Sequence, residues 1–245
     1  MNPFRLLHTS KKSHARVGEL TTAHGKVQTP FFMTIATRGA VKTLAAEDMR
    51  ALGAPIILSN TYHLFVRPGM EIFKKAGGLH KFMGWQGPIL TDSGGYQVFS
   101  LATKNKSVAN REVDYDVRIT NDGAEFIDRL SGRKDLFTPE RVLEIQQVIG
   151  SDIAMVLDVC APNPISYGGA KEAMEMTTEW AVRAASFAGA LLTTGLAVTR
   201  DPELFSGPEE AQRRWARLIA LAGVLAAVAA GLLVGSGAGI NEFQQ

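Results

Sequence analysis

The stretch GPILTDSGGYQVFS, residues Gly87–Ser100, decides how the first part of this chain is interpreted. Its apolar run, Pro88–Leu90, has the length and composition of a short buried strand. Asp92 follows at the carboxyl end of this strand, and the glycines at 94 and 95 allow the backbone to turn sharply and to approach a ligand closely. The pattern predicts a strand that delivers a carboxylate to a binding site.

Two further segments have the same form. The apolar run Pro55–Leu58 ends in the polar segment Ser59–His63, and the run Ile153–Leu157 ends in Asp158. Apolar strands that alternate with helical patterns are typical of a largely parallel sheet, and the carboxyl ends of parallel strands meet on the face where ligands bind. We therefore predict an α/β fold in which Asp92 and Asp158 face one pocket.

Local patterns predict one helix and one hairpin in the same region. In TPERVLEIQQVIG, Thr138 suits an N-cap, Pro139 the first turn, and Gly150 the end of a helix. In contrast, apolar and polar residues alternate strictly over Val113–Ile119, and the turn residues Asn121–Gly123 follow. This alternation predicts an antiparallel hairpin, which we interpret as an insertion on the βα scaffold.

Composition limits the classes of function. The 245 residues suffice for a sizeable core, and a net charge of +2 gives no global basic field, so that a nucleic acid would have to bind a local patch. The single cysteine, Cys160, excludes an internal disulfide and a multi-cysteine zinc site within this chain. Because the amino terminus has no apolar core of signal-peptide length, we expect residues 1–187 to be cytoplasmic.

The composition changes near Phe187, which predicts two segments, 1–187 and 188–245. No lysine follows Lys171, and the second segment is rich in Ala, Leu and Gly. We interpret it as an unrelated helical, apolar tail. Its charge-free run Leu218–Ile240 is long enough to span a bilayer and would then bring the tail to a membrane. A buried helix is the alternative, because Ala and Gly drive membrane insertion less than Leu or Ile does.

Longer segments carry a resemblance to a known family. They are TLAAEDMRALGAPIILSNTYHLFVRPG, AGGLHKFMGWQGPILTDSGGYQVFSL and LFTPERVLEIQQVIGSDIAMVLDVCAP. These segments resemble the queuine tRNA-ribosyltransferases, also called tRNA-guanine transglycosylases, and the resemblance covers Phe4 to Phe187. It implies a (β/α)8 barrel of the TIM type, present here only as an incomplete N-terminal half. It also implies a transferase of queuosine biosynthesis that exchanges guanine at the wobble position of tRNA with a GUN anticodon for a 7-deazaguanine base, preQ1 or queuine.

The resemblance implies roles for individual residues. Asp92 would act as general acid and base, Tyr96 would stack on the base, and Asp158 would bind the edge of the base, which suits the chemistry of carboxylates and aromatic rings. The residues expected to bind the base are Asp92, Ser93, Gly94, Gly95, Tyr96, Asp158 and Cys160. The pattern alone also allows turn or capping roles for the aspartates, a core position for the tyrosine, and a small buried hydrophobe for the cysteine.

Several features of the family have no counterpart after Phe187. They are a GIVQGG-like strand, a GLSVGE-like segment, the aspartate nucleophile and a zinc site of three cysteines and one histidine, so we expect no metal or other cofactor in this chain. Unpaired sheet edges would need cover from the tail, a second chain or a homo-oligomer. Two functions stay open. One is a transglycosylase, which we expect to be inactive as this chain alone, and the other is a noncatalytic truncated or fused product or a membrane-tethered module that binds base or tRNA.

Overall fold

The centre of the fold is a parallel sheet of four strands. The computed structural model describes residues 3–103, 117–128 and 131–198. The sheet has the order β10-β6-β5-β4, and all neighbouring strands are parallel. Its strands are β4 (Thr34–Ile35), β5 (Ile57–Ser59), β6 (Ile89–Thr91) and β10 (Ile153–Ala154). The predicted parallel sheet and its three polar strand ends are thereby confirmed, although β10 is shorter than the predicted run.

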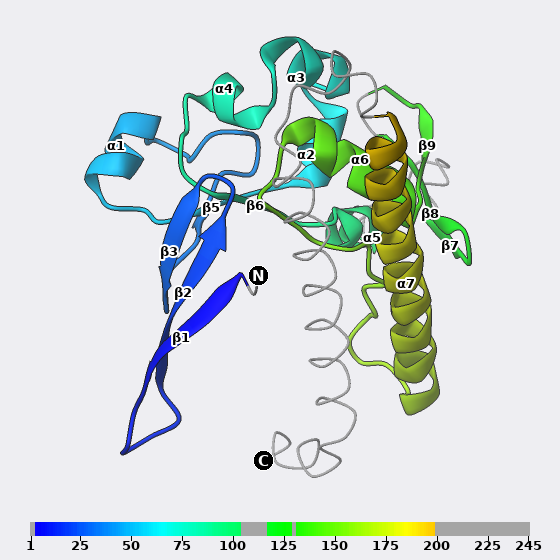
Figure 1. Cartoon of the computed structure of the whole chain (residues 1–245). Coiled ribbons are helices and arrows are strands. Elements are labelled where there is room, and N and C mark those ends of the chain that lie inside the picture. The colour runs from blue at the N-terminus through cyan, green and yellow to red at the C-terminus, as the bar shows by residue number, and fades with distance from the viewer. Residues whose placement is uncertain (1–2, 104–116, 129–130, 199–245) are drawn as a thin grey trace.

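Helices connect these strands and cover the sheet (Figure 1). They are α1 (Ala46–Ala51), α2 (Thr61–Val66), α3 (Met70–Ala76), α4 (Leu79–Met83), α5 (Gly95–Thr103), α6 (Pro139–Ile149) and α7 (Tyr167–Val198). The α6 helix has the predicted ends. The Thr138 side chain accepts a hydrogen bond from the Arg141 N–H at 3.1 Å, and Gly150 ends the helix in the left-handed conformation with φ 82°.

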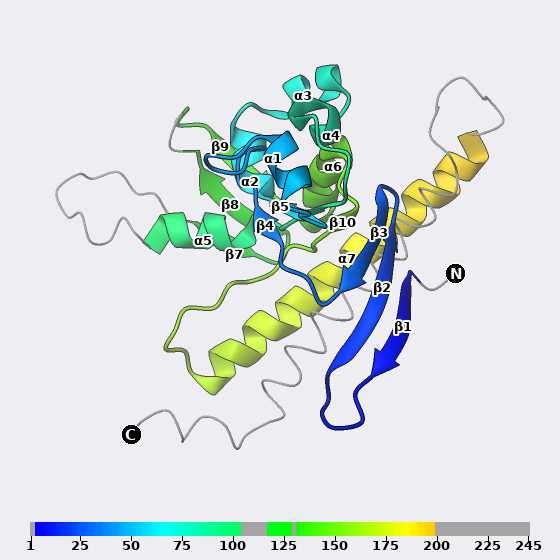
Figure 2. The same cartoon turned by 90° about the vertical axis from the view of Figure 1, so that its left-hand side faces the viewer.

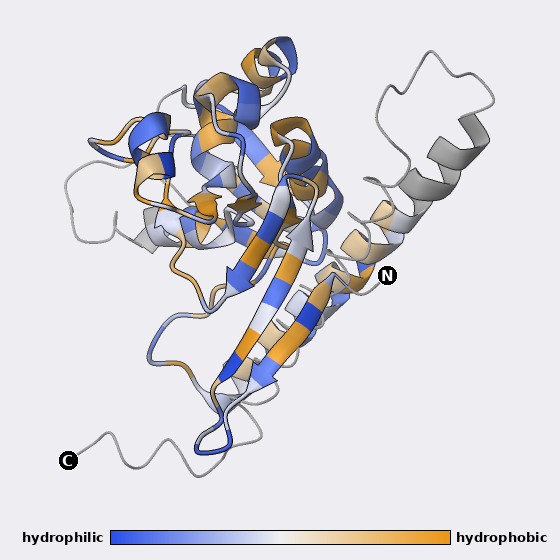
Figure 3. Ribbon diagram, turned by 60° about the vertical axis from the view of Figure 1, so that its left-hand side comes forward, coloured by the Kyte–Doolittle hydropathy of each residue, from blue (hydrophilic) through white to orange (hydrophobic). Residues whose placement is uncertain are grey.

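Two antiparallel sheets flank the parallel one. The first contains β1 (Phe4–Thr9), β2 (Arg16–Thr22) and β3 (Gly25–Thr29) and projects from the body, with apolar and polar residues interspersed along its strands (Figure 3). The second contains β7 (Arg118–Thr120), β8 (Gly123–Ile127) and β9 (Lys134–Phe137). The pairing of Thr120 with Gly123 confirms the predicted hairpin, while residues 113–116 of its first strand lie outside the described residues.

The long α7 helix contacts both the turn of the β7–β8 hairpin and α6 (Figure 2). Arg183 binds both carboxylate oxygens of Glu140 in α6, at 2.8 and 2.9 Å, and donates to the carbonyl of Asn121 in the hairpin turn at 2.8 Å. Trp180, which is buried, donates to the same carbonyl at 2.9 Å. The turn carbonyl and the helix are thus held together by charged and aromatic donors.

The structure leaves several predictions untested. The predicted boundary at Phe187 falls within α7, which continues to Val198, and stays a prediction. Within the described residues no helix is long and apolar enough to cross a membrane, while the candidate span 218–240 lies outside them. Within the described residues the parallel sheet has four strands, with β4 and β10 at its edges, and a complete barrel is not seen in this part of the chain.

Candidate functional site

The carboxyl ends of β5, β6 and β10 bring the predicted residues together. Asp92 follows β6, and the hydroxyl of Ser93 donates to Asp158 Oδ1 beyond β10 at 2.9 Å. The same hydroxyl oxygen accepts the N–H of Gly95, the first residue of α5, at 3.1 Å. The structure places Asp92 and Asp158 together at one edge of the sheet, with Ser93 as the link between them, and that they face one pocket stays a prediction.

Three N–H donors hold the Asp92 carboxylate. The N–H groups of Thr61 and Gly94 donate to Oδ1 at 3.0 and 3.1 Å, and the side-chain amide of Asn60 donates to Oδ2 at 2.5 Å. The Asn60 amide has only one orientation available, because its oxygen accepts the N–H of His63 at 2.9 Å as the N-cap of α2. The Asp92 carboxylate is therefore fixed in place before any ligand arrives.

The surroundings of Asp92 also set its proton affinity. Burial raises the pKa of Asp92, the donors at Thr61, Gly94 and Asn60 lower it, and the nearby Asp158 carboxylate raises it again. The net effect raises the pKa above the ordinary value. A carboxyl group with a raised pKa, held in a fixed position at the end of a strand, is suited to donate and accept protons.

The two glycines after Ser93 allow a close approach between segments of this chain. A Cβ at Gly95 would lie 2.9 Å from the Asp158 carbonyl oxygen and 3.0 Å from its Oδ1. Gly94 has φ 78°, and a Cβ there would lie 3.1 Å from the backbone nitrogen of Tyr62. Both positions therefore require glycine so that the strand ends can meet.

The remaining predicted residues border this group. Tyr96, in the first turn of α5, exposes 61% of its surface, so its ring is free for a planar ligand. Asp158 is exposed. Cys160 is half-buried, and its pKa is raised by burial and by the negative charge of Asp158. A raised pKa keeps the thiol protonated, which argues against a nucleophilic role for Cys160.

Sequence reasoning missed Asn60 and Thr61 as partners of Asp92. Besides its N–H contact, Thr61 donates its hydroxyl to the Asp92 carbonyl at 2.5 Å. The available signal was the polar segment at the end of β5, because β5 and β6 are neighbours and their ends must meet. What the sequence does not reveal is which of the polar residues turns toward the carboxylate.

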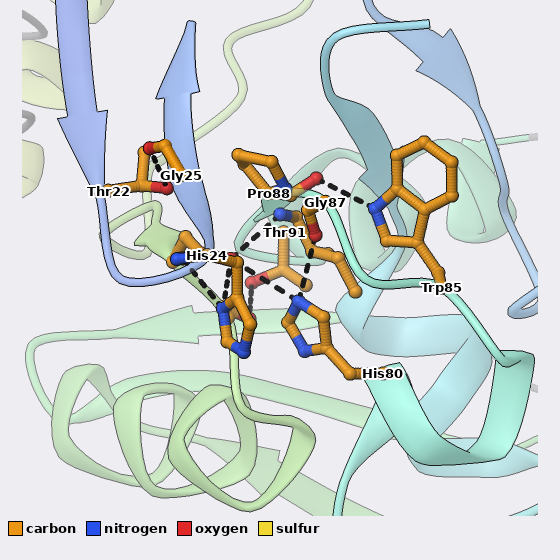
Figure 4. Close-up of polar contacts among 11 residues, drawn as sticks. Thr22, His24, Gly25, His80, Trp85, Gly87, Pro88 and Thr91 are labelled. Atoms are coloured by element: carbon orange, nitrogen blue, oxygen red, sulfur yellow. Dashed lines mark hydrogen bonds and ion pairs between the residues drawn. The ribbon is translucent and has the colours of Figure 1, made fainter. Parts of the chain in front are cut away.

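One group of metal-ligating side chains lies away from this edge, within the described part of the chain. Ligand atoms of His24, His80 and Asp152 lie within 4.8 Å of one another. His24 Nδ1 is 2.9 Å from Asp152 Oδ1, and His80 Nε2 is 3.0 Å from the Gly87 carbonyl oxygen (Figure 4). The two rings are stacked at 3.6 Å with an interplanar angle of 18°. Since imidazole binds a metal within its ring plane, such nearly parallel planes do not converge on one ion, and the geometry fits hydrogen bonds better.

We call these three residues the Asp152 clamp. The Asp152 side chain is fully buried and also accepts the N–H of Ile89 at 2.9 Å and that of His24 at 3.0 Å. Burial raises the pKa of Asp152, but the hydrogen bonds from His80, Ile89 and His24 outweigh this effect and lower the pKa below 3.8. The clamp ties the turn between β2 and β3 to the start of β6.

The clamp predicts a loss of stability in acid. A depressed pKa in the folded state stabilises the fold above the unfolded pKa, and this stabilisation is lost as the pH falls through the folded value. We expect the Asp152→Asn substitution to lower the free energy of unfolding by about 2 kcal/mol at neutral pH. The difference from the unsubstituted chain should shrink below pH 3.8 in urea unfolding curves. The exposed Asp122→Asn variant is the control, and a pH-independent difference would contradict the prediction.

Comparison with known proteins identifies the family. The family model for queuine tRNA-ribosyltransferase matches residues 10–201. A queuine tRNA-ribosyltransferase of Desulforudis audaxviator is 52% identical over 181 residues, which cover 74% of this chain and 45% of the relative. Those of Dictyoglomus turgidum and Aquifex aeolicus are 51% and 49% identical and are covered over 44% and 47% of their lengths. This chain thus spans about half the length of the relatives it matches, and it belongs to the queuine tRNA-ribosyltransferase family.

Proposed function

We propose that this chain supplies the base-recognition part of a tRNA-guanine transglycosylase. The reaction exchanges guanine at the wobble position of tRNA with a GUN anticodon for a 7-deazaguanine base such as preQ1 or queuine. The observation that supports it is the meeting of Asp92 and Asp158 at the ends of neighbouring parallel strands, with Ser93 between them. Carboxylates at such an edge can accept the N–H groups of guanine, and membership of the queuine tRNA-ribosyltransferase family supports this reaction.

Each residue has a defined part in this proposal. Asp92, with its raised pKa, gives a proton to the leaving base and takes one from the incoming base. Asp158 is exposed and accepts hydrogen bonds from the base edge, the exposed ring of Tyr96 stacks on the base, and the half-buried Cys160 borders the base two residues beyond Asp158. Ser93 orients Asp158 through its hydroxyl, and Gly94 and Gly95 let the strand ends approach.

We further propose that this chain alone does not complete the exchange. General acid and base catalysis contributes about 10²- to 10⁴-fold, which is too little to displace a base from ribose without a nucleophile. The matched residues cover less than half of the relative's length, and no family-like nucleophile follows Phe187 in the sequence. A second chain or a homo-oligomer that pairs with the β4 and β10 edges would complete the site, and a metal would then come from that partner.

A second candidate is a noncatalytic module that binds base or tRNA. The change to an Ala- and Gly-rich sequence after Phe187 favours it, because a truncated or fused product would show such a change. The run Leu218–Ile240 would tether this module to a membrane if it spans the bilayer. The expectation that residues 1–187 are cytoplasmic agrees with either candidate.

Two assays separate the candidates. Binding of guanine and preQ1 to the purified chain is measured by calorimetry, and incorporation of radiolabelled guanine into tRNA with a GUN anticodon is measured in parallel. We expect binding without incorporation. Incorporation that disappears in the Asp92→Ala variant would show that this chain supplies its own nucleophile. Absence of binding by folded protein would overturn the proposed recognition function.

A further inference from the structure

A buried polar group lies beneath the site, between β6, α6 and β10. Gln146 of α6 and Thr91 of β6 are fully buried, and Ser151 is 1% exposed. The Gln146 amide oxygen accepts the hydroxyl of Thr91 at 2.7 Å and the N–H of Met155 at 3.0 Å, and the amide nitrogen donates to the Met155 carbonyl at 2.9 Å. One side chain thus pairs with both backbone groups of a residue just after β10, as a neighbouring strand would.

These contacts fix the direction of every hydrogen bond in the group. Because Met155 presents an N–H and a carbonyl side by side, the Gln146 amide has one orientation only. Its oxygen then faces Thr91, so the Thr91 hydroxyl must donate to it. The Ser151 hydroxyl, 2.6 Å from that of Thr91, must in turn donate to Thr91. The described donors leave no alternative arrangement, and such fully satisfied networks specify one packing.

The position of this group connects it to the two carboxylates. Thr91 directly precedes Asp92, and Met155 lies on the segment that leads from β10 to Asp158. The ladder between β6 and β10 contains the pairs Leu90 with Ile153 and Thr91 with Ala154. Backbone hydrogen bonds extend it at both ends, from the Asp152 N–H to the Ile89 carbonyl at 2.9 Å and from the Met155 N–H to the Thr91 carbonyl at 3.1 Å. The Gln146 amide oxygen shares the Met155 N–H with the Thr91 carbonyl, so its side chain reinforces the last backbone contact of this short ladder, the one next to the two carboxylates.

We infer that Gln146 is a positioning residue that sets the distance between Asp92 and Asp158, and this inference rests on the proposed base-recognition function. Gln146 touches neither carboxylate and acts through Thr91 and Met155. A misplacement of about 1 Å in an active site costs up to about 10²-fold in rate, and we expect a similar sensitivity for the affinity of a base held by two carboxylates. This role accounts for an amide at a fully buried position where an apolar side chain would otherwise be expected.

The test uses two replacements of Gln146 and a matched neighbour. The Gln146→Met variant keeps the length and removes every hydrogen bond of the amide. The Gln146→Glu variant places an ionised oxygen against the Met155 carbonyl, but its protonated form restores a donor there. Gln147 is the next residue of α6 and is exposed, so Gln147→Met and Gln147→Glu serve as controls.

Guanine affinity is measured by calorimetry for each folded variant relative to the unsubstituted chain at the same pH. We expect Gln146→Met to weaken binding about 10- to 100-fold. Gln146→Glu should weaken it at about pH 9 and recover as the pH falls to about 6, since burial raises the pKa of a glutamate. A role in stability alone would lower Tm and leave these affinities unchanged, and that result would overturn the inference. If Gln146→Met fails to fold, Gln146→Glu provides the test: recovery of affinity at low pH supports the inference, and its absence overturns it.

A second measurement separates this inference from the proposed function. The Asp92 carboxyl is titrated by carbon NMR without ligand, in chains with Asp158 and with Asp158→Asn. The negative charge of Asp158 raises the pKa of Asp92, so the difference between the two titrations reports their distance. We expect Gln146→Met to change this difference and Gln147→Met to leave it unchanged. An unchanged difference in Gln146→Met would overturn the inference even if the chain binds no guanine.

Discussion

Replacing Asp92 by asparagine is expected to abolish detectable guanine binding, a loss of about 100-fold or more. Asparagine keeps the shape of the side chain and removes the charge. The three N–H donors from Asn60, Thr61 and Gly94 would then face an amide that offers one oxygen instead of two. One donor therefore loses its acceptor, and the amide can neither take up nor release a proton for the base.

Calorimetry with guanine measures this loss of affinity, and urea unfolding measures the effect of the substitution on stability. We expect the free energy of unfolding to fall by about 1 to 3 kcal/mol, because a buried donor is left without a partner. The exposed Asp122→Asn variant loses the same charge away from the site. Equal affinity of the Asp92→Asn variant and the unsubstituted chain would show that the carboxylate does not recognise the base.

The Asn60→Asp substitution is expected to shift the pH dependence of guanine binding upward. Aspartate is as good an N-cap as asparagine, so the contact with the His63 N–H and the start of α2 should survive. The new carboxylate would lie where the amide now donates to Asp92 Oδ2 at 2.5 Å. Two carboxylates at this distance hold one proton between them, which raises the pKa of the pair by at least about one pH unit.

The sign of the stability change follows from this raised pKa. The folded state binds more protons than the unfolded state between 3.8 and the folded value, so the free energy of unfolding falls as the pH rises through that range. We expect the Asn60→Asp variant to be least stable at neutral pH and to recover in mild acid. Urea unfolding and calorimetry across this range check both effects, with Gln147→Glu as the control for an added charge. Identical pH profiles would contradict the placement of Asn60 against Asp92.

The parts of the fold that were predicted share strong local signals. The strands β5 and β6 are apolar runs that end at polar residues, and α6 has a capping threonine and a terminal glycine. The first antiparallel sheet was missed because β1 is exposed at every position, so FRLLHT shows no contrast between a buried and a solvent face. The β9 strand, KDLF, is short and begins with charged residues, so its sequence also lacks the pattern that predicts a strand.

The sequence predicted those residues of the candidate site that follow directly after a strand. In the sequence, an aspartate directly follows each of two apolar runs, and the parallel pairing of β6 and β10 places Asp92 and Asp158 at one edge of the sheet. The supporting residues depend on contacts between distant segments. Asn60 reads as a helix cap and Gln146 as one polar residue on an apolar helix face, and neither position in the sequence indicates its partner.

The strands β6 and β10 are joined by side chains at successive levels along their length. The Asp152 clamp joins their amino ends, the Gln146 amide joins them beyond the ladder, and the hydroxyl of Ser93 joins their carboxyl ends. These ties hold the strands as one mechanical unit, whatever the route of the polypeptide between them. A sliding of one strand along the other would disturb all three ties at once, so the two strand ends that carry Asp92 and Asp158 resist such a shift together.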